Sequence, residues 1–233
     1  MAWKPLGCLV LFCLIDTGAL ATTPMDSAPT QQTFKVGALP FPCSWINTPK
    51  AFELLPGQAF SITAGPATDL YNGLDDGSRA ASAPMLAMAA DPAFVLTATV
   101  RVAFRKEYDG GFLVLFADPD HWVKLLFEKS HYGPYSVCSN VTNGGTDDNV
   151  HHDVQGQEVR LRITRSGDLF TLYSSLDGSH WTYLRLFRFA VKGALRQGFG
   201  AQSPVGEACT ATFMGIHYSP KASLDFWSGA PAK

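Results

Sequence analysis

The sequence lacks an excess of either charge, and it lacks the short motifs of several chemistries. Its 233 residues hold 18 Lys and Arg against 20 Asp and Glu, a net charge of -2. This balance gives no electrostatic reason to attract nucleic acid or an anionic membrane. The sequence has no Cys-x-x-Cys pair and no Gly-x-Ser-x-Gly turn, which disfavours a zinc site and Ser-His-Asp catalysis. We expect no metal and no cofactor.

The chain also lacks a leading apolar run long enough to cross a bilayer. Lys4 precedes a short apolar run over residues 9–15, and Ala19-Leu20-Ala21 follows as a small-x-small cleavage signal. Residues 1–21 are therefore predicted to be a secretory signal peptide cleaved after Ala21, the alternative being a disordered apolar N-terminus. Residues 22–33 would then form a flexible spacer. The mature protein is expected to be secreted or periplasmic, with no membrane attachment after cleavage.

Cysteine is scarce once the leader is removed, because only Cys43, Cys138 and Cys209 remain. Three thiols in an oxidising compartment allow at most one internal disulfide. The sequence does not choose among the three possible pairings. Three free thiols that pack as small apolar side chains are equally compatible with it.

What the sequence does hold is alternation of apolar and polar residues, the pattern of half-buried antiparallel strands. The clearest cases are residues 94–104 and 158–164. Residues 83–90 are the one place where a helical turn is expected. Further strands are predicted between turns rich in Gly, Pro, Asp and Asn, over residues 34–38, 52–55, 59–64, 112–117, 122–128, 135–141, 169–175, 181–188, 197–203 and 208–218.

A dozen short strands without an internal repeat favour two packed sheets over a propeller. We predict an all-β, two-sheet antiparallel jelly-roll sandwich over residues 34–218, with a C-terminal tail over 219–233. In this fold Asp177-Gly178 forms a hairpin turn, because Gly accepts positive φ and Asp tolerates it. His180 and Trp181 then belong to the scaffold and not to an active site.

One predicted strand, 122–128, carries a pattern that favours a binding site. Trp122, Lys124 and Glu128 share one face of it, since side chains alternate across a sheet. An aromatic plate, an ammonium and a carboxylate spaced by ~7 Å suit a polyhydroxylated ligand. The alternative is structural: Lys124 and Glu128 form cross-strand ion pairs, and Trp122 fills the rim of the core.

Seven short motifs, in order along the chain, resemble a known family. They are Trp45-Ile46-Asn47-Thr48-Pro49, Thr68-Asp69-Leu70-Tyr71, Tyr108-Asp109-Gly110-Gly111, Trp122-x-Lys124-x-x-x-Glu128, Val141-Thr142-Asn143-Gly144, Leu176-Asp177-Gly178 with Trp181, and Gln202-Ser203-Pro204-Val205-Gly206-Glu207-Ala208-Cys209. Together, over about residues 40–218, they resemble the domain of unknown function 1349 (DUF1349), a family of the concanavalin A-like lectin/glucanase superfamily.

The resemblance implies a jelly roll whose concave face commonly holds carbohydrate in relatives, and it implies no established activity. Its motifs add four residues, Tyr71, Tyr108, Asp109 and Asn143, to the candidate ligand-binding set. Two departures bear on ligand choice: Leu70-Tyr71 stands where Phe-Trp is usual, and the loop expected over residues 146–149 lacks the usual tryptophan.

Catalysis is disfavoured by a further absence, the two-glutamate strand pattern of retaining glucanases. Glu128 would need a carboxylate from another strand, for which Asp109 is the most plausible donor. A polar loop expected over residues 147–153 could hold calcium, but it has no EF-hand spacing. We therefore expect a non-catalytic, lectin-like module that binds an oligo- or polysaccharide. The alternatives are a glycan-active hydrolase and a protein-interaction domain.

Overall fold

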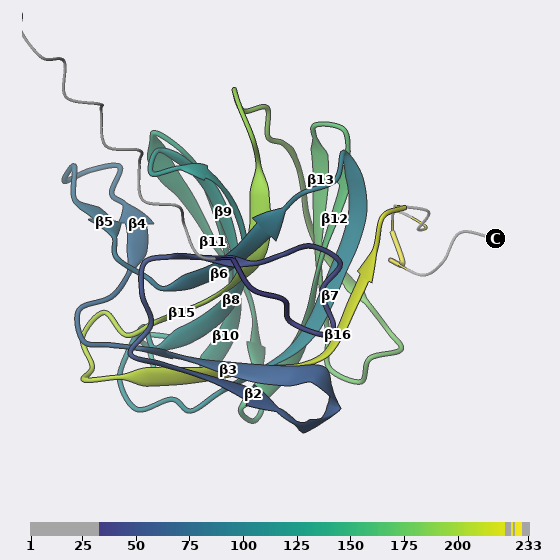
Figure 1. Cartoon of the computed structure of the whole chain (residues 1–233). Helices are drawn as coiled ribbons and strands as arrows, with labels where there is room; N and C mark the ends of the chain where they lie inside the picture. Colours follow the sequence, from purple (N-terminus) through teal and green to yellow (C-terminus); the bar gives the residue numbers. More distant parts are fainter. Residues whose placement is uncertain (1–32, 222–224, 226, 230–233) are drawn as a thin grey trace, which may run out of the picture. The chain divides into compact units, whose positions relative to one another are not determined.

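The computed structural model of the protein describes residues 33–221, 225 and 227–229. The predicted signal peptide, and the predicted spacer except for Thr33, lie outside the described residues. No described helix is long and apolar enough to cross a membrane. The described residues form a sandwich of two seven-stranded antiparallel sheets (Figure 1), which confirms the predicted all-β jelly roll.

The first sheet carries the site described below. Its neighbouring strands, in spatial order, are β1 (Ser44–Ile46), β6 (Met85–Ala89), β15 (Arg196–Gln202), β8 (Gly110–Asp118), β9 (His121–Lys129), β10 (Tyr135–Asn143) and β11 (Gly145–Val154).

The second sheet packs against the inner face of the first. In spatial order it consists of β14 (Thr182–Arg188), β13 (Leu169–Ser175), β12 (Glu158–Ser166), β7 (Ala93–Val102), β16 (Cys209–Ser219), β3 (Ala59–Ala64) and β2 (Ala51–Leu55). A single 3-10 turn, η1 (Pro56–Gln58), joins β2 to β3, and a separate hairpin pairs β4 (Leu70–Asn72) with β5 (Arg79–Ala81).

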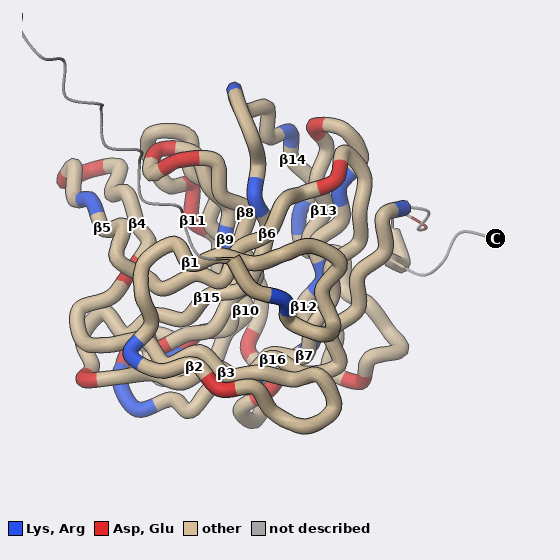
Figure 2. The backbone as a smooth tube through the Cα atoms, in the orientation of Figure 1, with Lys and Arg blue, Asp and Glu red and all other residues tan. Residues whose placement is uncertain are grey.

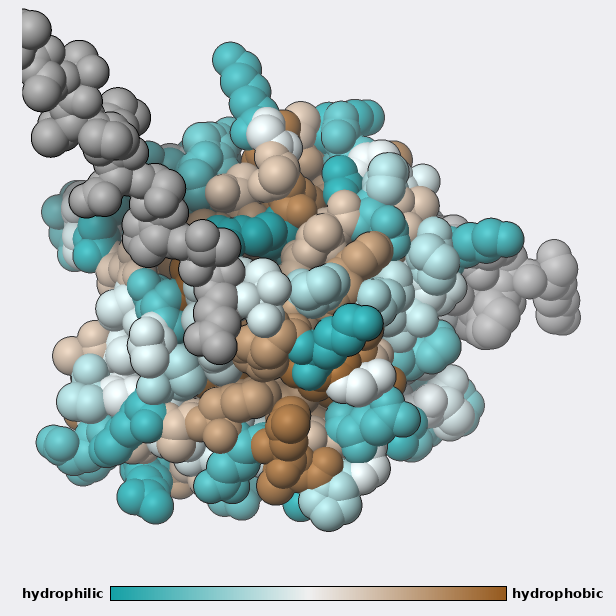
Figure 3. Space-filling model, in the orientation of Figure 1, coloured by the Kyte–Doolittle hydropathy of each residue, from teal (hydrophilic) through white to brown (hydrophobic). Residues whose placement is uncertain are grey.

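The core between the sheets follows from the alternation in the sequence. On β9, Val123, Leu125 and Phe127 are fully buried and point inward, where Phe94 and Leu96 of β7 belong to the same cluster. Burial of each such side chain contributes about 1.5–3 kcal/mol to stability. The outward faces are mixed: Figure 3 shows hydrophilic residues mainly around the edge of the visible face and more hydrophobic residues through its middle, with a strongly hydrophobic area near β2 and β3.

A second, smaller apolar cluster lies on the other face of the first sheet. Phe112, Trp122 and Leu126 form its floor, and Leu70 and Ala83, from the two ends of the β4–β5 hairpin segment, cover it. Strand β9 is therefore buried on both faces along most of its length. The hairpin segment forms a lid that shapes what remains of the outer face.

Three secondary-structure predictions were wrong, the first two being the helical turn over 83–90 and the strand over 34–38. Residues 83–90 contain strand β6 instead of a helical turn. Its sequence MLAMA lacks alternation because the strand lies between β1 and β15 and packs apolar side chains on both faces, so tertiary context overrides the helix propensity of Met, Leu and Ala. In the expected strand 34–38 only Phe34 pairs, in an isolated bridge to Cys43.

The polar segment expected to be a loop is also a strand. Residues 145–154 form β11, which pairs with β10 over its full length. Strand β11 is the last strand of the sheet, so much of it faces water and its polar side chains are tolerated. The Asp177-Gly178 turn was predicted correctly: it joins β13 to β14, and Asp177 Oδ1 accepts the N–H groups of Ser179 and His180, both at 2.8 Å.

Candidate functional site

A cavity of about 480 Å³ lies on the outer face of the first sheet, beside the β4–β5 hairpin. Strands β9, β10, β11 and β15 supply its floor and walls, and the loops before β4 and β8 supply its rim. This volume falls within the ordinary range of small-molecule sites. Its lining residues are Asp69, Tyr71, Tyr108, Lys124, Leu126, Glu128, Cys138, Asn140, Asp148, Gln202, Pro204 and Val205.

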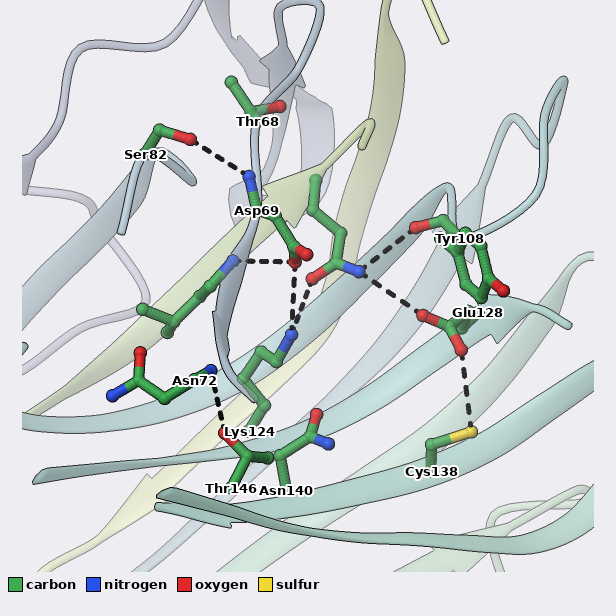
Figure 4. A network of polar contacts seen from close by, with 12 residues as sticks. Thr68, Asp69, Asn72, Ser82, Tyr108, Lys124, Glu128, Cys138, Asn140 and Thr146 are labelled. Atoms are coloured by element: carbon green, nitrogen blue, oxygen red, sulfur yellow. Dashed lines mark hydrogen bonds and ion pairs between the residues drawn. The ribbon is translucent and has the colours of Figure 1, made fainter. Parts of the chain in front are cut away.

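Lys124 is the central cation of the cavity, and it is only 2% exposed. Its Nζ donates to Gln202 Oε1 at 2.8 Å and lies 3.6 Å from Asp69 Oδ1 (Figure 4). The ammonium also lies 5.6 Å from the ring centroids of Phe112 and Trp122. These contacts compensate the burial of a charge that would otherwise be costly.

Glu128 is half-buried and lies two residues after Leu126, on the same face of β9. Gln202 reaches Glu128 from two strands away, its Nε2 donating to Glu128 Oε2 at 3.3 Å and to the Tyr108 carbonyl at 3.1 Å. Gly110 stands between them in register, and a Cβ there would lie 2.7 Å from Leu126 Cδ1 and 3.6 Å from Gln202 Cγ. The absence of a side chain at Gly110 therefore leaves the bridge open.

Burial raises the pKa of Glu128 to about 7, against the opposing attraction of the Lys124 ammonium. The negative charges of Asp148 and Asp69 raise it further. Cys138, on the neighbouring strand, lies with its Sγ 4.0 Å from Glu128 Oε1. Glu128 therefore exchanges its proton near neutral pH, which is unusual for a carboxyl and typical of functional sites.

Asn140 and Asp148 form the wall on the β11 side. Asn140 lies opposite Lys124 on β10, and Asp148 lies opposite Asn140 on β11. Asn140 Nδ2 donates to Asp148 Oδ1 at 2.7 Å, while Asn140 Oδ1 is buried without a hydrogen-bond partner among the described residues. Partial burial raises the pKa of Asp148, which the Lys124 charge opposes. Tyr71 lines the cavity near Asp148.

Tyr108 stands at the rim in a strained backbone conformation, with a φ of 62°. A left-handed conformation costs a non-glycine residue roughly 1–2 kcal/mol. Its N–H donates to the Lys129 carbonyl at 2.8 Å and its carbonyl accepts from Gln202, so both neighbouring strands fix it. Tyr108 is 37% exposed, and its ring lies parallel to the His131 ring, with the ring centroids 6.1 Å apart.

Four of the seven predicted ligand-binding residues line this cavity: Tyr71, Tyr108, Lys124 and Glu128. Trp122 does not, because its indole is fully buried beneath the hairpin, with its Nε1 donating to the Pro119 carbonyl at 3.2 Å. Trp122 packs in the smaller apolar cluster, in line with the structural alternative, and its ring offers no exposed face to a ligand. Asn143 is exposed at the end of β10 and lines a different hollow, beside Asp147 and Arg185.

Asp109 is fully buried and acts on the loop, not in the cavity. Its Oδ2 accepts the N–H groups of Arg105 and Lys106, both at 2.9 Å, and its Oδ1 accepts the Ser203 hydroxyl at 2.8 Å. These bonds fix the turn that carries Tyr108. Asp109 is therefore not the carboxylate partner of Glu128; the carboxylates that share the cavity with Glu128 are Asp69 and Asp148.

Sequence reasoning missed four polar residues of the site: Asp69, Asn140, Asp148 and Gln202. Asp69 and Gln202 lie within the motifs of the family resemblance, so a signal for them was present. Asn140 could be placed in the site only by knowing that it pairs with Lys124 in the register of β9 and β10. Asp148 could be placed there only by knowing that it pairs with Asn140 on β11, a segment that was expected to be a loop.

Neither a metal centre nor a disulfide is formed in the described part of the chain. No three His, Cys, Asp or Glu side chains there gather around a common point. The acidic residues over 147–153, for which calcium was considered as an alternative, lie along strand β11 and not in a loop. Cys43, Cys138 and Cys209 are all buried and free, so none of the three possible pairings forms.

Comparison with known proteins gives a family and a fold. The model of a family described as "Protein of unknown function (DUF1349)" matches residues 45–221. No curated protein matches the chain. Among solved structures, a functionally unknown protein from Saccharomyces cerevisiae has a TM-score of 0.70 and 23% identity, over 76% of this chain and 95% of that one.

Two enzyme chains share the fold over a part of their length. The GH43 protein BlXynB from Bacillus licheniformis has a TM-score of 0.59 and 12% identity, over 76% of this chain and 36% of that one. The Bacteroides ovatus xyloglucan GH43B protein has a TM-score of 0.55 and 18% identity, over 70% and 32%. This chain thus spans about a third of those enzymes, and identities this low establish the fold alone.

Proposed function

The chain belongs to the DUF1349 family, whose function is unknown, and from the cavity on its first sheet we propose that it is a secreted, non-catalytic module that binds carbohydrate. Secretion rests on the leader predicted over residues 1–21. The fold likeness to GH43 chains agrees with a carbohydrate ligand but does not carry the proposal, since one fold hosts many functions.

The observation that carries the proposal is the make-up of the cavity. Hydrogen-bonding groups line one concave space: the carboxylates of Asp69 and Glu128, the amides of Asn140 and Gln202, and the Lys124 ammonium. Sugar hydroxyls bind well to such groups, because each hydroxyl both donates and accepts. A hollow of this polarity gives a purely apolar ligand little to bind.

Aromatic rings supply the second requirement of a sugar site. Tyr71 and Tyr108 line the cavity with partly exposed rings. Such rings cover the apolar C–H face of a pyranose. The strained backbone of Tyr108 supports a role at this position, because strain that the surroundings hold in place gathers at binding sites.

The test is a glycan-array screen of the full chain, followed by calorimetry with the best saccharide and two tyrosine variants. Tyr108→Ala removes a cavity ring and should weaken binding about tenfold or more, which corresponds to about 1.4 kcal/mol. Tyr132→Ala is the matched control, since Tyr132 is 90% exposed and does not line the cavity. Circular dichroism checks that both variants fold.

Loss of binding in Tyr108→Ala alone supports the proposal. A saccharide that binds both variants equally well would move the site elsewhere on the molecule. An array without any hit would contradict the carbohydrate proposal and favour a protein-interaction domain.

A glycan-active hydrolase is the second candidate, and one observation favours it. A carboxyl with a pKa of about 7 shares the cavity with two other carboxylates, Asp69 and Asp148. Glycoside hydrolysis uses a protonated acid beside an ionised base or nucleophile. Release of new reducing ends from a bound saccharide, lost in Glu128→Gln, would establish the enzyme over the module.

A further inference from the structure

Carboxylate and amide oxygens outnumber the nitrogen donors on the side chains that line the cavity. Asn140 is only 4% exposed, and its Oδ1 has no partner among the described residues. Figure 4 shows this oxygen directed toward the side of the sheet that carries the Lys124 ammonium and the Glu128 carboxylate. A buried acceptor left without a donor costs roughly 1–3 kcal/mol, so a ligand that donates there would recover this energy.

The charges of the cavity are unbalanced in the same sense. Three carboxylates line it, those of Asp69, Glu128 and Asp148, against one cation. That cation, Lys124, is already bound to Asp69 and Gln202. Among the described residues, Asp148 receives the neutral amide of Asn140 as its one side-chain hydrogen-bond donor. The raised pKa values of Glu128 and Asp148 have the same cause, since burial there is not offset by enough positive charge.

Further negative charge lies on the β4–β5 hairpin, outside the cavity but close enough to act on Tyr71. Asp75 and Asp76, at the tip of the β4–β5 hairpin, join Asp69 and Asp148 in raising the pKa of Tyr71, after burial itself. Figure 2 shows acidic positions at that tip beside one basic position. A ligand that approaches the cavity therefore meets a negative potential on the hairpin side.

We infer that the preferred ligand of the cavity is an amino sugar, a saccharide whose free amine binds as an ammonium to the oxygens of Asp148 and Asn140. The ammonium has three donors, which suits a carboxylate and a carboxamide oxygen held side by side on β11 and β10. The inference rests on the carbohydrate-binding function proposed above and names its ligand class.

Other sugar classes fit less well. A uronic acid would bring a fourth carboxylate against three. A neutral sugar would satisfy the Asn140 oxygen with a hydroxyl but would leave the carboxylates uncompensated. An ammonium does both, and its bond to a carboxylate is roughly twice as strong as a bond between neutral groups. The partly exposed rings of Tyr71 and Tyr108 also favour a nearby cation.

The experiment compares three hexasaccharides by calorimetry with the full chain near neutral pH: a glucosamine oligomer, its N-acetylated counterpart and a glucose oligomer. The glucosamine oligomer carries amines that can be charged, whereas each nitrogen of its N-acetylated counterpart is a neutral amide. We expect the glucosamine oligomer to bind about tenfold or more tightly than either neutral oligomer, and Asp148→Asn to remove most of this preference. Glu53→Gln, which neutralises an exposed carboxylate on β2 outside the cavity, should leave it intact.

The outcomes separate this inference from the function on which it rests. Binding of the neutral oligomers with no gain from the amine overturns the amino-sugar preference and leaves the carbohydrate module standing. Binding of none of the three overturns both. A preference that Glu53→Gln weakens as much as Asp148→Asn does would mean attraction to the overall negative charge, and it would overturn the assigned site.

Discussion

At the scale of single residues, Glu128 couples the cavity to pH. Its pKa is about 7 in the folded chain against an ordinary value of 4.5, with burial as the main cause. An acid whose pKa is raised by folding stays protonated up to a higher pH in the folded state than in the unfolded state. Between these two values the unfolded chain binds fewer protons, so stability falls as the pH rises.

The measurement is the free energy of unfolding in urea, for the wild type and Glu128→Gln, across this range. The wild type should lose stability relative to the variant between about pH 4.5 and about pH 7, by up to roughly 3 kcal/mol. Below this range the two should differ by a constant. The side-chain amide introduced by Glu128→Gln retains an oxygen for the Gln202 amide, so the bridge between the strands survives.

Glu53→Gln serves as the control, because Glu53 is exposed on β2. Its stability profile should follow that of the wild type at every pH. Parallel profiles for the wild type and Glu128→Gln would contradict the raised pKa of Glu128.

At the scale of elements, the β4–β5 hairpin is the part of the fold that makes the outer face into a cavity. Asn72 anchors it: Nδ2 donates to the carbonyls of Pro119 at 3.0 Å and Gly144 at 3.1 Å, and the Asn72 N–H donates to Thr146 Oγ1 at 2.9 Å. Asn47 holds the other side, its Nδ2 donating to the carbonyls of Ala81 and Ala83. The hairpin thus depends on two side-chain amides.

Asn72→Asp tests this dependence, because it sets a buried carboxylate against two carbonyl oxygens and removes both donors. Losing them should cost about 1–3 kcal/mol, mainly in the stability of the hairpin. We expect hydrogen exchange to accelerate over residues 70–81 while β7 and β9 remain protected, and saccharide binding to weaken because Asp69 and Tyr71 move. Gln157→Glu, an exposed amide-to-acid change in the turn between β11 and β12 and outside the cavity, should alter neither. Uniformly faster exchange in all strands would show that the hairpin is not a separate unit.

The number of buried faces on each strand explains which strands could be predicted from the sequence. Strands with one buried face, such as 158–166, alternate and were found. Strand β6 is buried on both faces and β11 lies at an edge, so neither alternates as expected. The candidate face of β9 was found through Lys124 and Glu128, but Trp122 on the same face proved buried, because the period of a strand does not reveal what later folds over it. Asn140 and Asp148 needed the register of β10 and β11, which no local pattern gives.

At the scale of the whole sandwich, the two sheets enclose one large core and leave a smaller one under the hairpin. The three described thiols belong to these cores: Cys43 and Cys209 to the large one and Cys138 to the small one. Burial raises the pKa of each thiol, that of Cys43 to about 11. Thiols of this kind are unreactive, because the thiolate is the nucleophile.

Thiol labelling should therefore report how each core opens. We expect a maleimide to label none of the three in the native chain, in a variant where Cys8 and Cys13, outside the described residues, are replaced by Ser. As urea is added, Cys138 should react first, since it lines the cavity and becomes accessible once the hairpin opens. Cys43 and Cys209 should react only on global unfolding.

Because no disulfide joins the three, a reductant should leave the melting temperature unchanged. If all three thiols were labelled at the same urea concentration, both with Asn72 present and in the Asn72→Asp variant, the sandwich and its hairpin would open as one cooperative unit.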